Sequence, residues 1–242
     1  GAQYLRHCIA VREEAEAAAD VVALVHSEPR GTLRVSCPVT LAQTMVGELL
    51  PKFTALYPQV RLDLQVSNRV VNLVEEGIDV ALRVRPTLDD SGSLVIKPLG
   101  TSQTLLVACP DQLRRQGPVA TVDDLARLDT VAMSVADGRT TWRLQGPGNV
   151  IHEWVHQPRW VADDLLTLKF AVLGGVGVCV LPDYMCRDEL DAGRLVTVLP
   201  GWCPAPGRVH AVFASRRGLA PAVRRFLDFL GEHLGKAPGG PA

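Results

Sequence analysis

Polar side chains at the ends of predicted strands are the residues of this sequence best suited to hold a ligand. Thr40 follows a short apolar strand and Pro38, and Arg83 lies near the end of a later strand. Thr40 and Gln43 have the spacing of a capping box, which predicts a helix whose free N–H groups and dipole favour an anion. An arginine can clamp a carboxylate through two parallel hydrogen bonds. We therefore predict a site for a small anion formed by Pro38, Val39, Thr40 and Arg83.

Two further groups of polar residues are also candidates for this site. Thr101 and Ser102 lie where a strand is expected to cross into another domain, and they could offer polar contacts. Asp163 precedes an apolar helix and could face the ligand, although N-capping of that helix is the simpler role for it or for Asp164. For Arg83, a structural ion pair or a solvated surface position remains the alternative.

Catalysis is not predicted from the motifs. The sequence has no G-x-S-x-G, no H-E-x-x-H and no phosphate-binding P-loop pattern. The glycine-rich run 174–177 follows a predicted helix and precedes a strand, which is the reverse of the order in a dinucleotide-binding fingerprint. His152 and His156 fall in a strand-like stretch, where their spacing gives no helical metal site. We expect no enzymatic activity, no cofactor and no metal.

The bulk composition fits a globular protein without a nucleic-acid-binding surface of its own. The 242 residues are 47% hydrophobic and carry a formal net charge of −1, so no global basic field attracts DNA. No segment approaches the roughly 18 apolar residues of a membrane span, and the first residues lack a signal peptide. A cytoplasmic location is expected. The six cysteines are then expected to be reduced core thiols, with redox sensing, above all by Cys37, as the alternative.

The first 28 residues are predicted to form a linker helix for dimerisation. Small and apolar residues recur there at alternating spacings of four and three, which is a heptad seam. So narrow and alanine-rich a seam buries little within one chain, which favours pairing with a second helix over packing on its own domain. The seam comprises Tyr4, Cys8, Val11, Ala15, Ala18, Val22 and Val25.

The next segment has the pattern of a βαβαβ unit. Strands are predicted at 33–37, 60–66 and 78–84, and helices at 41–57 and 68–76. Strands that alternate with helices imply a parallel sheet with right-handed crossovers.

The remaining chain continues the α/β pattern. A capping box at 121–124 opens a short helix, and 138–148 is predicted to be rich in loops. The tail 236–242 is predicted to be disordered. Further strands are expected at 94–96, 104–109, 130–134, 150–155, 176–181, 195–199 and 209–213, and further helices after 164, ending at 174–175, and at 221–234.

The order of these pieces resembles the effector-binding half of LysR-type transcriptional regulators over nearly the whole chain. The resemblance rests on several motifs in the family's order and spacing. They are Val11–Glu16 in the linker helix, Gly31–Ser36 in the first strand, Leu49–Phe53 with Tyr57–Pro58, Glu76–Arg83, and Gly174–Pro182.

The resemblance implies an α/β fold of two Rossmann-like subdomains with a hinge, similar to type 2 periplasmic binding proteins. Residues 31–103 and 206–235 would form subdomain I, and 104–205 would form subdomain II. An effector would bind between them, where the family also implies contacts from strand ends such as Met133 and Ser134. Dimers or tetramers are implied. Nothing in the sequence resembles the family's winged helix-turn-helix, so this chain alone is not expected to bind operator DNA.

A periplasmic-type solute-binding protein for a small organic acid is the alternative with the same cleft. The heptad seam and the missing signal sequence favour the regulator. In that interpretation, a small anionic metabolite shifts the subdomains, and subunit contacts carry the shift to the DNA-binding heads.

Overall fold

The computed structural model describes residues 28–88, 94–133, 135–214 and 219–234. Residues 1–27 of the predicted dimerisation helix, the predicted tail and Ser134 lie outside these ranges. No helix within the described ranges is long and apolar enough to span a membrane.

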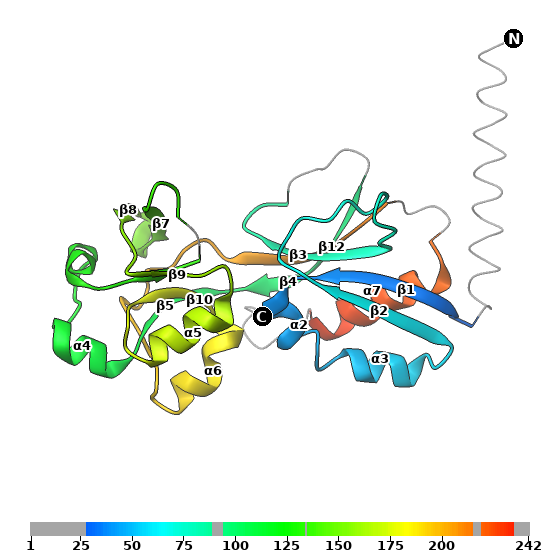
Figure 1. The fold of residues 1–242 in the computed structure, drawn as a ribbon, viewed down its shortest axis with the longest axis horizontal. Helices are drawn as coiled ribbons and strands as arrows, with labels where there is room; N and C mark the ends of the chain where they lie inside the picture. Colours follow the sequence, from blue (N-terminus) through cyan, green and yellow to red (C-terminus); the bar gives the residue numbers. More distant parts are fainter. Residues whose placement is uncertain (1–27, 89–93, 134, 215–218, 235–242) are drawn as a thin grey trace, which may run out of the picture.

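One half of the molecule, which we call lobe I, is built on a five-stranded sheet in the order β2-β1-β3-β12-β4 (Figure 1). β1 pairs in parallel with both β2 and β3, as predicted for the βαβαβ segment. β12 lies antiparallel between β3 and β4, so the last strand in sequence sits inside the sheet. The strands are β1 (Gly31–Cys37), β2 (Val60–Val66), β3 (Val80–Arg85), β4 (Val95–Ser102) and β12 (Gly207–Phe213).

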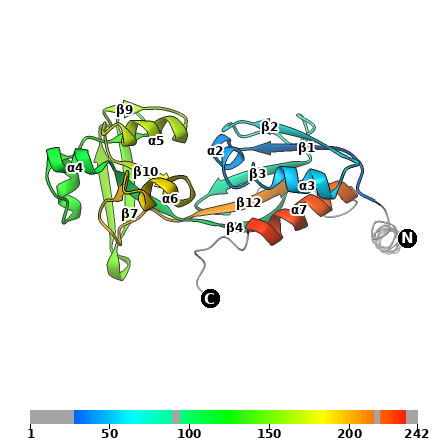
Figure 2. The same cartoon turned by 90° about the horizontal axis from the view of Figure 1, so that it is seen from below.

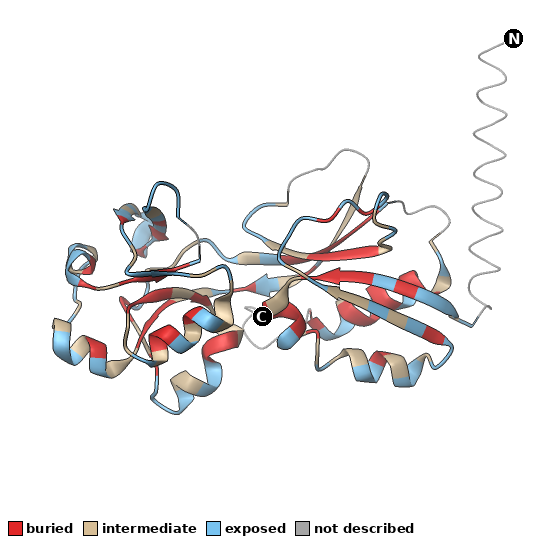
Figure 3. Ribbon diagram, viewed as in Figure 1, coloured by how far each residue is buried: buried red, intermediate tan, exposed pale blue. Residues whose placement is uncertain are grey.

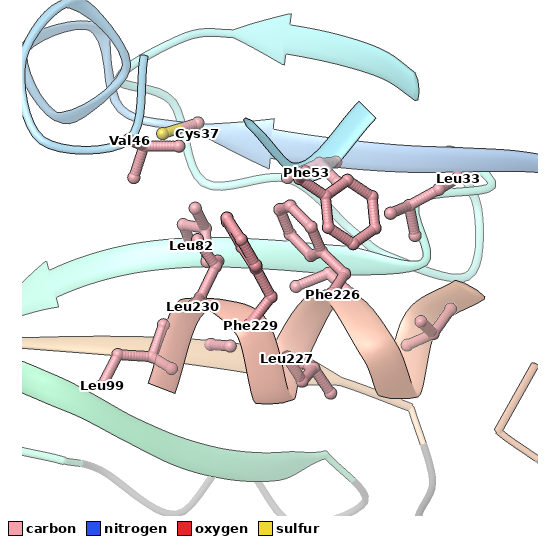
Figure 4. Close-up of a cluster of buried hydrophobic side chains, with 14 of the residues drawn as sticks. Leu33, Cys37, Val46, Phe53, Leu82, Leu99, Phe226, Leu227, Phe229 and Leu230 are labelled. Atoms are coloured by element: carbon pink, nitrogen blue, oxygen red, sulfur yellow. The ribbon is translucent and has the colours of Figure 1, made fainter. Parts of the chain in front are cut away.

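Helices α3 (Leu50–Leu56) and α7 (Pro221–Leu234) cover one face of this sheet (Figure 2). α7 buries an amphipathic stripe, and the ring of Phe226 meets that of Phe53 edge-on at 5.1 Å. Phe229 completes an aromatic cluster, with its ring centroid 5.5 Å from that of Phe53 (Figure 4). This core also receives the buried side of β1, including Leu33. Helix α7 has the bounds predicted from its hydrophobic pattern.

The other half, lobe II, has a three-stranded sheet in the order β10-β5-β11, with antiparallel pairing throughout. A two-stranded parallel pair, β6 with β9, and an antiparallel hairpin, β7 with β8, complete it. The strands are β5 (Thr104–Ala108), β6 (Val131–Ala132), β7 (Thr140–Gln145), β8 (Ile151–His156), β9 (Trp160–Val161), β10 (Cys179–Pro182) and β11 (Val196–Thr197). The helices are α4 (Pro110–Gln116), η1 (Val122–Arg127), η2 (Pro147–Asn149), α5 (Leu165–Leu173) and α6 (Asp183–Asp191).

Each lobe has hydrophobic clusters of its own. The main cluster of lobe I draws only on residues 33–99 and 209–234, and the two clusters of lobe II draw on 105–202. Figure 3 shows buried segments in both lobes. The chain passes between the lobes at Gln103 and again before β12 (Figure 1). The subdomain boundaries proposed from the sequence remain a prediction.

The predicted helix over 41–57 is wrong as a single element. It is divided into α2 (Val39–Gln43) and α3, with hydrogen-bonded turns between them. The wider turn is marked by the bond from the N–H of Val46 to the carbonyl of Leu41, at 3.0 Å. Pro51 lies in the first turn of α3, where its missing N–H costs nothing; inside a continuous helix it would have left a carbonyl unpaired.

The predicted helix over 68–76 is also wrong, because this segment forms turns. The carboxylate of Glu76 accepts the N–H of Asn72 at 2.9 Å and binds the guanidinium of Arg69. Such side-chain bonds to the backbone compete with a helical ladder. Gly77 still ends the segment with a positive φ of 62°.

Residues 138–148 are not the loop that we predicted, because β7 occupies most of them. Trp142 and Leu144 are buried while their neighbours are exposed, which is the period of a strand with one covered face. Helices α4 and α6 were not predicted either. α4 begins at Pro110, and proline is common at the first helical position; α6 begins at Asp183, and acidic residues are common in the first turn.

Candidate functional site

A cavity of about 280 Å³ lies between the lobes, at the carboxyl ends of β1 and β3. In an open α/β sheet, this is the position where ligands bind. Thr40 and Leu41 of α2 line it from lobe I and Leu165 of α5 lines it from lobe II, and Figures 1 and 2 show these two helices in neighbouring parts of the two lobes. The lining comprises Ser36, Pro38, Thr40, Leu41, Ser67, Asn68, Arg69, Val70, Val71, Ala81, Leu82, Arg83, Val84, Arg85, Met133, Leu165, Pro182 and Tyr184.

The structure brings four of the predicted site residues to this cavity. Pro38, Thr40 and Arg83 contribute to it from lobe I, and Met133 contributes from lobe II. The other predicted residues that the structure describes do not line it: Val39, Thr101, Ser102 and Asp163.

Thr40 does not cap a helix, contrary to the prediction. Helix α2 already begins at Val39, its N-cap position is Pro38, and no side chain caps it. Thr40 is instead a buried residue of the first turn, and its carbonyl accepts the hydroxyl of Thr44 at 2.7 Å. With only five residues, α2 has a small dipole, so the predicted helix field contributes little to the site.

Cationic side chains share one face of the lobe I sheet beside the cavity. Arg83 and Arg85 are two residues apart on β3, and residues at this spacing point to the same face. In the antiparallel register, Arg85 lies opposite Arg208, which lies opposite Thr101 on β4. Directly opposed side chains share a face of the sheet. Arg83, Arg85 and Arg208 therefore form a row of cations on one face, and Thr101 lies at the end of this row on the edge strand β4.

The charge of Arg83 is not balanced within the described residues. Neither Arg83 nor Arg85 forms a salt bridge with a described carboxylate, and the described lining of the cavity holds no Asp or Glu. Partial burial and the neighbouring charge of Arg85 both lower the pKa of Arg83, although an arginine stays protonated. The structural ion pair considered for Arg83 is thus not formed with any described residue.

A buried histidine lies beside this row. His210 is opposite Arg83 in the register and only 3% exposed, and its Nδ1 lies 2.9 Å from the carbonyl of Arg208. Burial is the main cause that lowers the pKa of His210; the bond to the carbonyl of Arg208 opposes this shift, and the charges of Arg83 and Arg85 add to it. The imidazole is therefore neutral at pH 7, and the positive charge of the site comes from the arginines.

Lobe II supplies a largely apolar wall to the cavity. Met133, Leu165, Pro182 and Tyr184 face it from the end of β6, the start of α5, and the start of α6. Burial raises the pKa of the Tyr184 phenol, so its hydroxyl stays protonated and can donate a hydrogen bond. Lobe I thus offers cations and hydroxyls, and lobe II offers apolar surface and one phenol.

Asn68 connects the two walls. Its Oδ1 accepts the N–H of Val39 at 3.1 Å, and its Nδ2 donates to the carbonyl of Asp163 at 3.1 Å. Asp163 itself is exposed, whereas Asp164 is the N-cap of α5 and accepts the N–H of Thr167 at 2.8 Å. One of the two aspartates therefore caps the helix, as predicted.

The sequence interpretation did not single out Asn68 or Tyr184. Asn68 follows the end of β2, so the rule that polar residues after parallel strands face the ligand edge would have found it. The predicted helix over 68–76 hides this signal, because it includes Asn68. Tyr184 depends on α6, which was not predicted, although an acidic residue such as Asp183 is a usual signal for the first turn of a helix.

Neither a metal-binding cluster nor a buried thiol gives the described residues a second candidate site. No group of three or more His, Cys, Asp or Glu that could hold a metal ion occurs among them. Cys37, Cys179 and Cys186 are buried, and burial raises the pKa of each thiol to about 12. Such thiols are not nucleophilic at neutral pH.

Comparisons with known proteins agree on one family. The sequence profile of the LysR substrate binding domain matches residues 26–235. An HTH-type transcriptional regulator of Xanthomonas campestris pv. campestris is 36% identical over 234 residues, which are 95% of this chain and 67% of that protein. The regulator CrgA of Neisseria meningitidis serogroup C is 31% identical over 239 residues, which are 97% of this chain and 78% of CrgA.

Comparison with solved structures indicates the same family. The structure of CrgA from Neisseria meningitidis, a LysR-type transcriptional regulator, is similar with a TM-score of 0.76 and 28% identity, over 98% of this chain and 79% of that chain. The fold is therefore the mixed α/β, type 2 periplasmic-binding-protein-like fold of LysR regulatory domains, as predicted. The relatives are transcriptional regulators and not enzymes. This chain belongs to the LysR family and is the effector-binding region of a LysR-type transcriptional regulator.

Proposed function

We propose that this region senses a small anionic metabolite, most simply a carboxylate, in the cavity between its lobes. The observation that carries the proposal is the pair Arg83 and Arg85 in a lining that holds no described carboxylate. Like charges on neighbouring and opposed residues cost stability, and a bound anion would offset that cost. The cavity volume of about 280 Å³ lies at the lower end of ligand sites, which suits a small molecule.

The two walls suggest how such a ligand would be oriented. Its carboxylate would lie against Arg83 with the hydroxyl of Thr40 nearby, and its apolar part would lie against Met133 and Leu165. A ligand that touches both lobes binds one of their relative arrangements better than the other, and can therefore shift the equilibrium between them.

The regulatory output would follow from that shift. In an assembly of two or four copies, a change in lobe orientation would alter the positions of the DNA-binding heads on the operator and so change transcription. Pairing through the heptad seam of residues 4–25 is part of this proposal, as are operator contact through a separate DNA-binding domain and a cytoplasmic location.

Matched pairs of acids and neutral amides test the anion site. Benzoate, phenylacetate and isobutyrate, each paired with its amide, would be screened by thermal shift and followed by calorimetry. We expect at least one acid to raise the melting temperature while its amide does not.

Three variants separate the site from general charge effects. Arg83→Gln and Thr40→Val should weaken binding of the active acid, whereas Arg187→Gln, on the exposed surface of α6, should not. The proposal is wrong if no acid stabilises the protein. It is also wrong if Arg83→Gln and Thr40→Val bind the active acid as tightly as Arg187→Gln does.

A further inference from the structure

One side-chain hydrogen bond joins the lobes away from the two crossing segments, within the part of the chain that the structure describes. It runs from Asn68 Nδ2 in lobe I to the carbonyl of Asp163 in lobe II, at 3.1 Å. Asn68 also lines the cavity, so the donor end of this bond lies at the space where the effector is proposed to bind.

The orientation of the Asn68 amide is set by both partners. Its Oδ1 must face the donor, the N–H of Val39, and its Nδ2 must face the acceptor, the carbonyl of Asp163. The opposite orientation would place N–H against N–H and oxygen against oxygen. The neighbouring bond from the N–H of Ser67 to the carbonyl of Cys37, at 3.0 Å, holds this backbone beside the end of β1.

The acceptor belongs to a segment that shapes the opposite wall. Asp163 directly precedes Asp164, the N-cap of α5, and Leu165, the first residue of α5, lines the cavity. A bond to the carbonyl of Asp163 therefore fixes the start of α5 relative to Val39 and the end of β1.

We propose that Asn68 is a positioning residue of the effector site, which sets the separation of the two lobes through its amide group. Its Oδ1 anchors it to lobe I, and its Nδ2 holds the start of α5. A ligand that requires another separation must break this bond, so Asn68 contributes to which lobe arrangement is populated before a ligand arrives. Only the statement about ligands rests on the proposed function; the lobe separation is a property of the unliganded protein.

Two substitutions at this position separate the two bonds. Asn68→Asp keeps an oxygen that can accept the N–H of Val39. It replaces the NH2 group that donates to the carbonyl of Asp163 with a second oxygen, which repels that carbonyl. Asn68→Ala removes both bonds. Asp163→Ala is the matched control, because the acceptor is a backbone carbonyl that this substitution retains.

The lobe separation can be measured by electron–electron double resonance without any ligand. Nitroxide labels would be placed at Lys52→Cys on α3 and Arg187→Cys on α6, both exposed, with Cys8, Cys109 and Cys203 replaced by serine. We expect Asn68→Asp and Asn68→Ala to shift or broaden the distance distribution, and Asp163→Ala to leave it unchanged. The proposal is overturned if Asn68→Asp reproduces the parent distribution, even if Asn68→Ala does not.

Binding gives a second, separable readout. With benzoate as the probe, Asn68→Ala should change the affinity by up to about tenfold, the range of one hydrogen bond, while Asp163→Ala should match the parent. A parent protein that binds neither benzoate nor the other acids would contradict the proposed function and leave the distance comparison standing. An unchanged distance in Asn68→Asp would contradict the positioning role whatever the affinities are.

Discussion

At the scale of single residues, His156 shows how burial fixes a protonation state. Its ring stacks on Trp154 at 4.1 Å and meets Trp142 edge-on at 4.4 Å. Its Nδ1 lies 2.8 Å from the hydroxyl of Thr130, while its buried Nε2 has no hydrogen-bond partner among the described residues. Burial lowers the pKa of His156 from 6.5 to about 4, because a charged imidazole in this cluster would lose its hydration.

The stability of the protein should therefore decline as the pH falls from 6.5 to 4. In that window the unfolded chain binds a proton at His156 and the folded protein does not, so protonation favours unfolding. The loss from this group is at most about 1.4 kcal/mol for each pH unit crossed, is absent above pH 6.5, and levels off below pH 4. Urea unfolding across this range measures it. His156→Phe keeps an aromatic ring but cannot titrate, so it should show a shallower decline; an identical slope in both proteins would contradict the assignment.

The buried thiols should be inert in the folded protein. With a pKa of about 12, Cys37, Cys179 and Cys186 hold only about one thiolate in ten thousand at pH 8. We expect iodoacetamide to label these three at least about tenfold more slowly than the half-buried Cys109 and Cys203, and all five equally in urea. Peptide mass spectrometry reads each site. Fast labelling of Cys37 in the folded state would instead revive the redox alternative.

Residue types at strand ends predicted some of the residues that line the cavity, but not which residues of other strands lie beside them. Pro38, Thr40, Arg83 and Met133 line it because each lies at or near the end of its strand, which a sequence pattern reveals. The opposition of Arg85 and Arg208 depends on the register of β3 with β12, more than 120 residues apart, and no local pattern encodes it.

At the scale of elements, the start of α5 depends on one carboxylate. Asp164 Oδ2 accepts both the N–H of Thr167 at 2.8 Å and its hydroxyl at 2.9 Å. Asp164→Ala should destabilise the protein by about 1 kcal/mol, the usual cost of losing an N-cap. Chemical unfolding of this variant beside Asp163→Ala checks the prediction, since the exposed neighbour makes no cap bond and should change stability little. Equal effects of the two variants would contradict it.

Elements with a clear period and clear end signals were predicted well, and the others were not. α7 has a strong apolar stripe and a proline in its first turn, and its predicted bounds match. Between β1 and β2 the apolar pattern continues across two helices, because residues of the intervening turn, such as Val46, also pack into the core. Periodicity therefore could not reveal the break there, although Pro51 could have done so.

At the scale of the whole molecule, the two sets of hydrophobic clusters predict separate responses to a core mutation. Phe226 is fully buried in the core of lobe I, and truncation of such a ring to alanine costs about 3–5 kcal/mol. In Phe226→Ala, hydrogen exchange should accelerate in β1, β3 and α7, and much less in β5, β10 and α5.

The matched control for this experiment is Phe170→Ala, because Phe170 is 64% exposed on α5 and should tolerate the change. Equal acceleration in both lobes of Phe226→Ala would mean that they unfold as one cooperative unit. The division at residues 103 and 206 would then fail as a description of independent subdomains.

The position of β12 between β3 and β4 has a consequence for how the protein is made. A ribosome releases β3 and β4 more than 100 residues before the strand that separates them in the finished sheet. Until residues 207–234 emerge, both strands have open edges and the rings around Phe53 lack their covering helix. The segment of lobe II is complete earlier, so the nascent chain can finish its second half first and only then close its first half with its final residues.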